Sequence, residues 1–145
     1  MIKVSEVNTM IIMQCYSALH HFPMIDYAFN EMARVLKKGG QLFIADPTPN
    51  DNDTIGLADK YMRMKPDGHV KFYTQNEFFN LADNTGFRMN NIFKTEIRFP
   101  RKDASHYNTL ICDADKSIVD GYNIRIIDDE IYITEQVLNL SFIKN

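Results

Sequence analysis

The 145-residue sequence has only two cysteines, no tryptophan and no long hydrophobic run. Cys15 and Cys112 lie far apart, which excludes a dense disulfide framework and favours a reduced, cytoplasmic protein. The longest apolar runs, such as residues 9–13, are far shorter than the roughly 20 residues that a helix needs to cross a membrane. Residues 1–6 lack the apolar core of a secretory signal. We therefore expect no membrane partner.

The chain also has no excess of basic residues. Sixteen Lys and Arg stand against 19 Asp and Glu, for a formal net charge of −3. This balance argues against nucleic acid as a partner, because neutralising phosphates requires a basic surface. A hydrophobic content of 45% with 24% charged residues excludes disorder and is ordinary for one folded domain.

The first half of the sequence alternates strand-like and helix-like segments. Residues 7–16 are apolar without strict alternation, which is typical of a strand buried on both faces. Over residues 25–36 the apolar side chains recur every three or four positions and predict a helix, which Gly39 and Gly40 would end. Residues 41–46 predict a second buried strand. This order indicates a parallel strand–helix–strand crossover.

The second half changes from helix to strand. Residues 53–65 predict a helix, and a capping box formed by Thr74 and Glu77 begins another that stops at Gly86. Beyond Gly86 the pattern predicts an antiparallel hairpin that pairs residues 93–99 with 107–112. The remaining expected elements are a short helix over 115–122, a hairpin of 124–127 with 130–133, and a last strand over 138–142.

Several blocks of sequence, in their order and spacing, resemble class I S-adenosylmethionine-dependent methyltransferases of the ubiquinone- and menaquinone-biosynthesis-like (type 11) group. The blocks span residues 15–22, 31–40, 42–47, 69–77 and 82–87. The resemblance covers roughly residues 7–113. It implies that 7–16 and 41–46 correspond to the fourth and fifth strands of the family, and the hairpin at 92–112 to its last two.

The fold class that the resemblance implies is α/β. We expect a partial Rossmann-like methyltransferase sheet, with parallel strands plus an antiparallel C-terminal hairpin and a small β-rich C-terminal extension. Residues 1–113 would be the C-terminal half of a methyltransferase-like domain, and residues 114–145 an extension, a hairpin and a strand, packed on the same domain.

The glycine-rich cofactor loop of the family has no counterpart. The six glycines include no G-x-G pattern, and the sequence begins just before the expected fourth strand. The resemblance therefore implies S-adenosylmethionine as cofactor only if a missing N-terminal half is supplied. A truncated product, part of a split protein and a specialised remnant all remain open.

The resemblance also implies roles for residues near the strand ends. Gln14, Cys15 and Tyr16 end the expected fourth strand and would line the methionine part of the cofactor. His20 and His21 follow, and an imidazole could deprotonate a nucleophile before methyl transfer. The alternative for the two histidines is a helix-entry position, with one ring bonded to the backbone. No residue spacing here suggests a zinc site.

The acceptor side of the resembled site falls on residues after the fifth strand. Asp46 and Thr48 close that strand, and His69 and Tyr73 precede the capped helix, so all four are candidates for binding a small-molecule acceptor. Turn chemistry before Pro47 and capping or packing near the helix are the structural alternatives.

Two functions follow as hypotheses. The first is a methyltransferase, or a fragment of one, for an unidentified small molecule. The second is a catalytically inactive remnant without cofactor that self-associates. The second follows from an uncovered fourth strand, whose free backbone groups would pair with another chain or be covered by the tail after residue 113. We therefore expect a homodimer through this edge.

Overall fold

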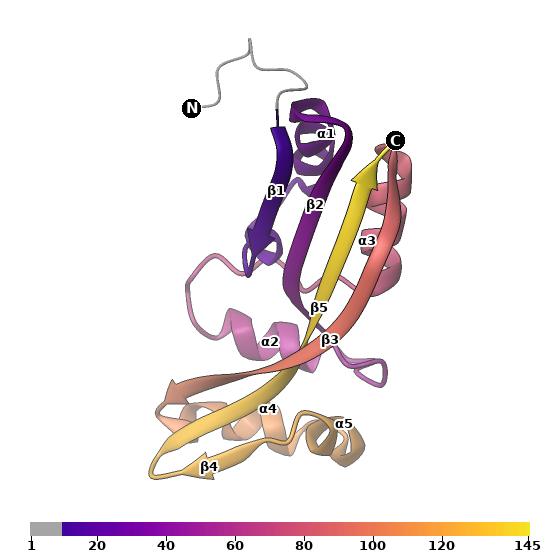
Figure 1. The fold of residues 1–145 in the computed structure, drawn as a ribbon. Coiled ribbons are helices and arrows are strands. Elements are labelled where there is room, and N and C mark those ends of the chain that lie inside the picture. Colours follow the sequence, from indigo (N-terminus) through magenta and orange to yellow (C-terminus); the bar gives the residue numbers. More distant parts are fainter. Residues whose placement is uncertain (1–9) are drawn as a thin grey trace.

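The alternating patterns fold into one mixed sheet with its helices packed against it (Figure 1). The structure is a computed structural model that describes residues 10–145, so positions 7–9 of the expected first strand lie outside the described residues. The strands are β1 Met10–Tyr16, β2 Leu36–Thr48, β3 Phe87–Lys102, β4 Arg125–Ile127 and β5 Glu130–Lys144. The helices are α1 Ile25–Val35, α2 Leu57–Arg63, α3 Gln75–Asn84, α4 Asn108–Cys112 and α5 Lys116–Gly121, with 3-10 turns at Leu19–His21 and Ala104–Tyr107.

The sheet has the strand order β1-β2-β5-β3, and the short β4 pairs with β5. β1 and β2 are parallel, whereas β5 runs antiparallel to both β2 and β3. The last strand of the sequence therefore lies inside the sheet. This arrangement confirms the expected α/β, Rossmann-like fold class with an antiparallel C-terminal pair.

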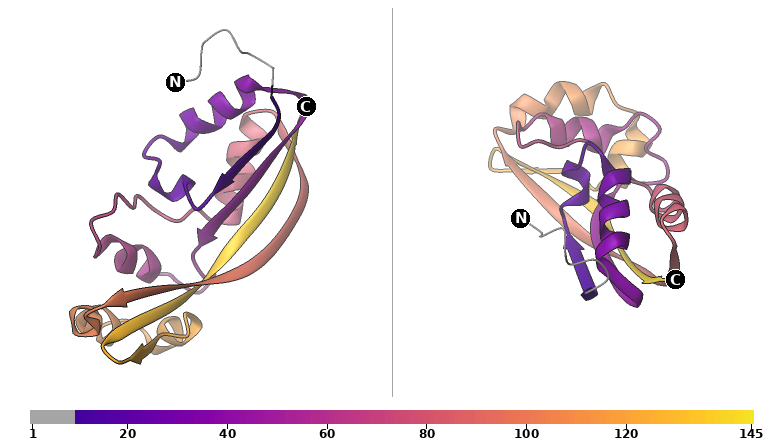
Figure 2. Two further views of the ribbon diagram at one scale, coloured as in Figure 1. Left: turned by 60° about the vertical axis from the view of Figure 1, so that its left-hand side comes forward. Right: turned by 90° about the horizontal axis from the view of Figure 1, so that it is seen from above.

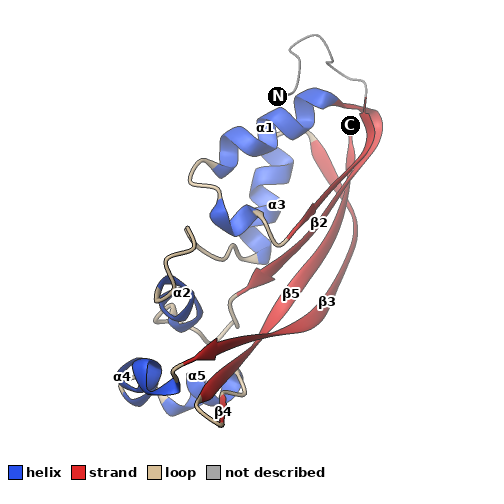
Figure 3. Ribbon diagram, turned by 90° about the vertical axis from the view of Figure 1, so that its left-hand side faces the viewer, coloured by secondary structure: helices blue, strands red, loops and turns tan. Residues whose placement is uncertain are grey.

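Helices α1 and α3 cover one face of the sheet and enclose the first hydrophobic core (Figure 3). Phe29 of α1 and Phe78 of α3 are fully buried in this core, with ring centroids 6.3 Å apart. Alternate residues of the strands, such as Leu42 and Ile44 on β2, complete it. The period of two along each strand thus fixes which face receives the helices.

A second core lies where β3 and β5 continue past the end of β2 (Figure 2). Helices α2, α4 and α5 pack there around Tyr61, Tyr122 and the isoleucines of β5. The Tyr61 and Tyr107 rings contact each other, with centroids 4.9 Å apart. Residues 114–145, expected as an extension, supply part of this second core and the inner strand β5, while a domain boundary at residue 113 stays a prediction.

Several local predictions are confirmed. Thr74 and Glu77 form both hydrogen bonds of the capping box at the start of α3. Asp115 caps α5 by accepting from the Ser117 amide at 2.8 Å. The expected tail hairpin forms between β4 and β5, with Arg125 paired to Tyr132 and Ile127 to Glu130.

The expected role of Gly39 and Gly40 was wrong. β2 begins at Leu36, directly after α1, so neither glycine ends the helix. A Cβ on Gly40 would lie 3.1 Å from the Ile11 carbonyl oxygen and 2.8 Å from that of Lys37. Gly40 therefore lets β1 approach the irregular start of β2, where the register between the two strands shifts.

The expected pairing of residues 93–99 with 107–112 was also wrong. Residues 104–112 form a 3-10 turn and α4, because Ala104 and Tyr107 bury one helical face in the second core. β3 pairs along its length with β5 instead. The expected separate strands 130–133 and 138–142 are parts of this one strand, Glu130–Lys144.

β1 is an edge strand of the described sheet and carries exposed apolar side chains. Ile11 is 65% exposed, and Met10 and Ile12 are also exposed. β1 contains no charged residue or proline that would discourage pairing with another chain. Its free backbone groups and apolar side chains support the expectation of a homodimer, which stays a prediction.

The second core contains a buried acid. Glu135 is 0% exposed and shares alternate positions of β5 with Ile131 and Ile133. Neither of its carboxyl oxygens has a hydrogen-bond partner within residues 10–145. Burial raises the pKa of Glu135 to about 9; the Asp59 and Asp53 carboxylates act in the same direction, and Arg101 opposes them. Glu135 is therefore protonated at neutral pH.

Dimerisation through β1 predicts that an exposed apolar residue on this strand is needed for association. We expect the wild-type chain to sediment as a dimer at micromolar concentration, and Ile11→Lys to sediment as a monomer, because opposed lysines would repel each other across a paired edge. Ile126→Lys on β4, at a site that is 54% exposed, is the matched control and should remain dimeric. A monomeric wild-type chain contradicts the prediction.

Glu135 predicts a pH-dependent stability. Its pKa is higher in the folded state than its ordinary value of 4.5, so the folded state holds this proton more tightly than the unfolded chain does. Its contribution to the free energy of unfolding is complete below about pH 4.5 and is lost as pH rises toward 9, by about 1.4 kcal/mol per pH unit. In urea unfolding at pH 6, 7 and 8, Glu135→Gln should lose this component. If the free energy of unfolding changes with pH by the same amount in the wild-type and Glu135→Gln proteins, Glu135 is already ionised in the folded state, which contradicts the prediction.

Candidate functional site

The candidate site lies where β1 and β2 end. Parallel strands bring their carboxyl ends to the same edge of a sheet, and the segment after β1 lies beside the end of β2 there. Ser17 turns the chain with a φ of 45° while its amide donates to the Ala45 carbonyl at 2.8 Å. The next residues, 18–22, carry the two neighbouring histidines.

Asp46, near the end of β2, holds this segment in place. Its buried carboxylate accepts hydrogen bonds through Oδ2 from the amides of Ala18 (3.0 Å) and Leu19 (2.9 Å). Its Oδ1 lies 2.7 Å from Nδ1 of His20. Asp46 therefore fixes both the backbone and the imidazole of the segment after β1.

The pairing with Asp46 determines the tautomer of a neutral His20 ring. An ionised carboxylate only accepts hydrogen bonds, so Nδ1 of His20 carries the proton and Nε2 presents a lone pair. Within residues 10–145, Nε2 has no hydrogen-bond partner. An imidazole held in this way can accept a proton, while the carboxylate stabilises the resulting imidazolium. The structure thus fixes the orientation of the His20 imidazole, and its predicted catalytic role stays a prediction.

His21 differs from His20 although the two rings are neighbours, with centroids 4.2 Å apart. The His21 side chain is exposed, and its imidazole has no hydrogen-bond partner in the described part of the chain. Of the two residues predicted as catalytic, only His20 is held in a fixed orientation.

A third imidazole joins the cluster from a distant segment. His69 precedes α3, and its ring centroid lies 5.6 Å from that of His20 and 6.4 Å from that of His21. Nε2 of His69 lies 2.7 Å from Oδ1 of Asp59 on α2. Burial alone would raise the pKa of the Asp59 carboxyl, but hydrogen bonds from His69 and from the Phe72 amide outweigh it and hold that pKa below its ordinary value.

Thr48 and Tyr73 join the end of β2 to the segment before α3. The Thr48 hydroxyl donates to the Tyr73 carbonyl at 2.9 Å, and the Tyr73 hydroxyl donates to the Phe22 carbonyl at 3.2 Å. Asp46 and His69 lie beside His20, and the Tyr73 hydroxyl reaches the segment that carries His20 through Phe22. Their predicted contact with a substrate stays a prediction, because their visible bonds are to the protein itself.

The three residues predicted to line a cofactor do not share one face. Cys15 packs against the first core, and burial, together with the Asp46 charge, raises the pKa of its thiol. Tyr16, the next residue, is exposed and borders a small pocket on the opposite face of the sheet. Gln14 is exposed as well. Side chains alternate along a strand, so Cys15 and Tyr16 cannot line the same cleft with their side chains.

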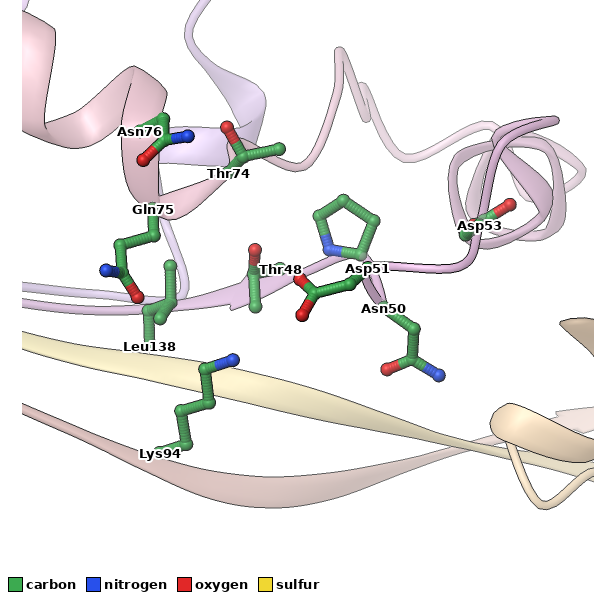
Figure 4. A pocket seen from close by; sticks show the side chains of 10 residues that line it. Thr48, Asn50, Asp51, Asp53, Thr74, Gln75, Asn76, Lys94 and Leu138 are labelled. Atoms are coloured by element: carbon green, nitrogen blue, oxygen red, sulfur yellow. The ribbon is translucent and has the colours of Figure 1, made fainter.

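A polar pocket of about 460 Å³ adjoins the end of β2 (Figure 4). Thr48, Asp51, Thr74, Gln75 and Lys94 are among its lining residues. Lys94 extends from β3 toward the end of β2, and its strand position pairs through Leu138 with that of Asp46. The pocket therefore lies on the same face of the sheet as Asp46.

Sequence reasoning missed Asp59, which lies inside the predicted helix 53–65 without any motif around it. Its ten-residue separation from His69 gives no periodic signal. Within residues 10–145, no group of His, Cys, Asp and Glu side chains is arranged to hold a metal ion. In the same part of the chain, no helix combines the length and apolar character needed to cross a membrane.

A family model described as "Methyltransferase domain" matches residues 11–91, which is more than half of the chain. No curated protein matches the sequence.

Solved structures share the fold. A protein of Bacillus halodurans assigned as a methyltransferase superimposes with a TM-score of 0.80 at 20% identity, over 95% of this chain and 65% of that one. YcgJ of Bacillus subtilis gives a TM-score of 0.77 at 18% identity, over 96% of this chain and 65% of that one. A phosphoethanolamine N-methyltransferase of Haemonchus contortus, solved with phosphomonomethylethanolamine and S-adenosylhomocysteine, gives 0.57 at 15% identity, over 96% of this chain and 34% of that one.

The chain thus spans less than two thirds of the length of each of these proteins. The matched segment contains β1, α1, β2, the cluster around His20 and α3. The chain belongs to the methyltransferase domain family, with the fold of class I S-adenosylmethionine-dependent methyltransferases.

Proposed function

We propose that the chain forms the acceptor-side part of an S-adenosylmethionine-dependent methyltransferase that acts on a small molecule. The observation that carries this proposal is the oriented Asp46–His20 pair at the shared carboxyl end of β1 and β2. In open α/β sheets, ligands bind at this end of the strands.

The chemistry available to the chain is proton transfer and positioning. S-adenosylmethionine, when bound, supplies a methyl group that is already activated. A hydroxyl, amine or acidic carbon that attacks the methyl group loses a proton, and we propose that this proton passes to Nε2 of the buried His20. The polar pocket beside Thr48 offers amide, hydroxyl and charged groups that can align a polar acceptor.

The residues present do not make a complete cofactor site. The sequence has no G-x-G turn, which would let the backbone approach the cofactor closely, and Cys15 and Tyr16 face opposite sides of β1. We therefore propose that cofactor binding needs a glycine-rich segment that these 145 residues do not contain.

The exposed edge of β1 favours a second candidate function. Met10, Ile11 and Ile12 are exposed on a strand with a free edge, which fits a self-associating module that binds no cofactor. The two candidate functions predict different effects of adding a glycine-rich segment. The added segment restores cofactor binding if the chain is part of a methyltransferase, and it does not if the chain is a self-associating module.

Ligand titration of a fusion tests the proposed function. The part of YcgJ that the superposition leaves uncovered, fused to this chain, should give a protein that binds S-adenosylhomocysteine at micromolar concentration by calorimetry. The unfused chain is the control and should show no micromolar binding. A folded fusion, judged by circular dichroism, that gives no heat even at millimolar ligand would favour the cofactor-free module instead.

The two carboxylate-bound histidines predict opposite tautomers. Long-range ¹⁵N–¹H NMR at a pH where both rings are neutral should find His20 protonated on Nδ1 and His69 protonated on Nε2, because each facing carboxylate can only accept. The exposed His21 is the internal control and should show no fixed tautomer. A His20 ring protonated on Nε2 would remove the proposed base.

A further inference from the structure

We infer that Asp59 is a positioning residue for His20, acting through His69 and the segment 69–72. The inference deepens the proposed function, since it rests on His20 being the base of that site. Asp59 lies on α2, outside the strands that hold His20 directly.

Asp59 fixes the segment before α3 at two points. Its Oδ1 accepts from Nε2 of His69 at 2.7 Å and from the Phe72 amide at 2.7 Å. One carboxylate oxygen thus holds both ends of a four-residue stretch. Arg63, one turn further along α2, donates to the Val70 carbonyl between them at 2.5 Å.

Residues of the same stretch are hydrogen-bonded to the backbone of His20. The Val70 amide donates to the His20 carbonyl at 2.8 Å, and the Lys71 amide does so at 3.3 Å. These are the residues that lie between the two anchors of Asp59. A shift of the anchors would therefore move the carbonyl group of His20.

The aromatic rings transmit the same constraint to the imidazole. The Phe72 ring meets the His20 ring edge-on at 5.3 Å and the His69 ring at 4.6 Å. With the His69 ring 5.6 Å from that of His20, two of the three rings beside His20 come from the stretch that Asp59 holds, and the third is the adjacent His21. Asp46 holds Nδ1 of His20 by a hydrogen bond, and the contacts with Phe72 and His69 restrict rotation of the His20 ring.

The charge of Asp59 holds His69 in one tautomer. Its hydrogen bonds hold its pKa below the ordinary value, so it is ionised at neutral pH and keeps the His69 proton on Nε2. Nδ1 of His69 is buried and has no hydrogen-bond partner in the described part of the chain. A proton on Nδ1 would be buried without an acceptor, which disfavours the tautomer of His69 that carries its proton there.

Asp59→Leu tests the inference in the full chain by NMR. The variant removes both anchors while keeping a similar side-chain size. We expect amide exchange at Val70 and Lys71 to accelerate by about tenfold. Because the released segment no longer holds the His20 carbonyl, the His20 ring should move away from Asp46 and lose its fixed Nδ1–H tautomer. Asp120→Leu removes a carboxylate from the exposed helix α5 and should change neither.

A purely structural role gives a different result. Faster exchange at Val70 and Lys71 with an unchanged His20 tautomer would show that Asp59 only ties α2 to the loop, and would overturn the inference. If Asp59→Leu does not fold, the Asp59→Asn variant is used to distinguish the positioning role of Asp59 from a purely structural one. Its neutral acceptor bonds are about half as strong, so we expect about threefold faster exchange and partial loss of the fixed tautomer. An unchanged His20 signal in that variant also overturns the inference.

This experiment needs neither cofactor nor acceptor. Its outcome is therefore independent of the titration of the YcgJ fusion: a fusion that binds no ligand refutes the proposed function, whereas an unresponsive His20 tautomer refutes only the role of Asp59.

Discussion

The arrangement of the candidate site depends on one buried carboxylate. Asp46 is the point where β2, the turn after β1 and the first histidine meet, and all its visible hydrogen bonds serve that junction. A buried charge is tolerated only when hydrogen bonds replace its hydration. Two backbone amides and an imidazole provide that replacement. The same hydrogen bonds that stabilise the buried Asp46 carboxylate therefore also fix the position of His20.

Around this junction the fold adds further layers of support. Thr48 and Tyr73 join the end of β2 to the segment before α3, and Asp59 joins that segment to α2. The residues involved come from four separate parts of the chain, and the parallel β1–β2 pair brings the first two together. The site is therefore a product of the crossover topology, which explains why its residues are so far apart in the sequence.

The sequence was informative where one local pattern decides the structure. The periodicity of α1 and the capping box of Thr74 predicted their helices, because both signals depend on neighbours within one or two turns. The junction at Asp46 and the cluster of His20 with His69 were predicted only as nearby candidates, through a family resemblance. Asp59 was missed, since only the packed fold brings it to His69.

The errors also have physical causes. Residues 107–112 have strand-forming side chains, but burial of Tyr107 against Tyr61 favours a helical turn there. β3 was assigned the wrong partner because strand pairing is a long-range choice, and β5, more than 40 residues away for most pairs, supplies the longer apolar edge. Gly40 was interpreted as a helix end, although its missing Cβ serves the close approach of β1.

Hydrogen exchange at the amides of Ala18 and Leu19 is the sharpest test of whether Asp46 organises the site. Ala18 and Leu19 lie in a short connection where regular secondary structure would not protect them, and Asp46 is the acceptor for both. If Asp46 organises the site, these amides should exchange as slowly as amides in the centre of β2, only through global unfolding. Exchange at the rate of an exposed loop would contradict the account.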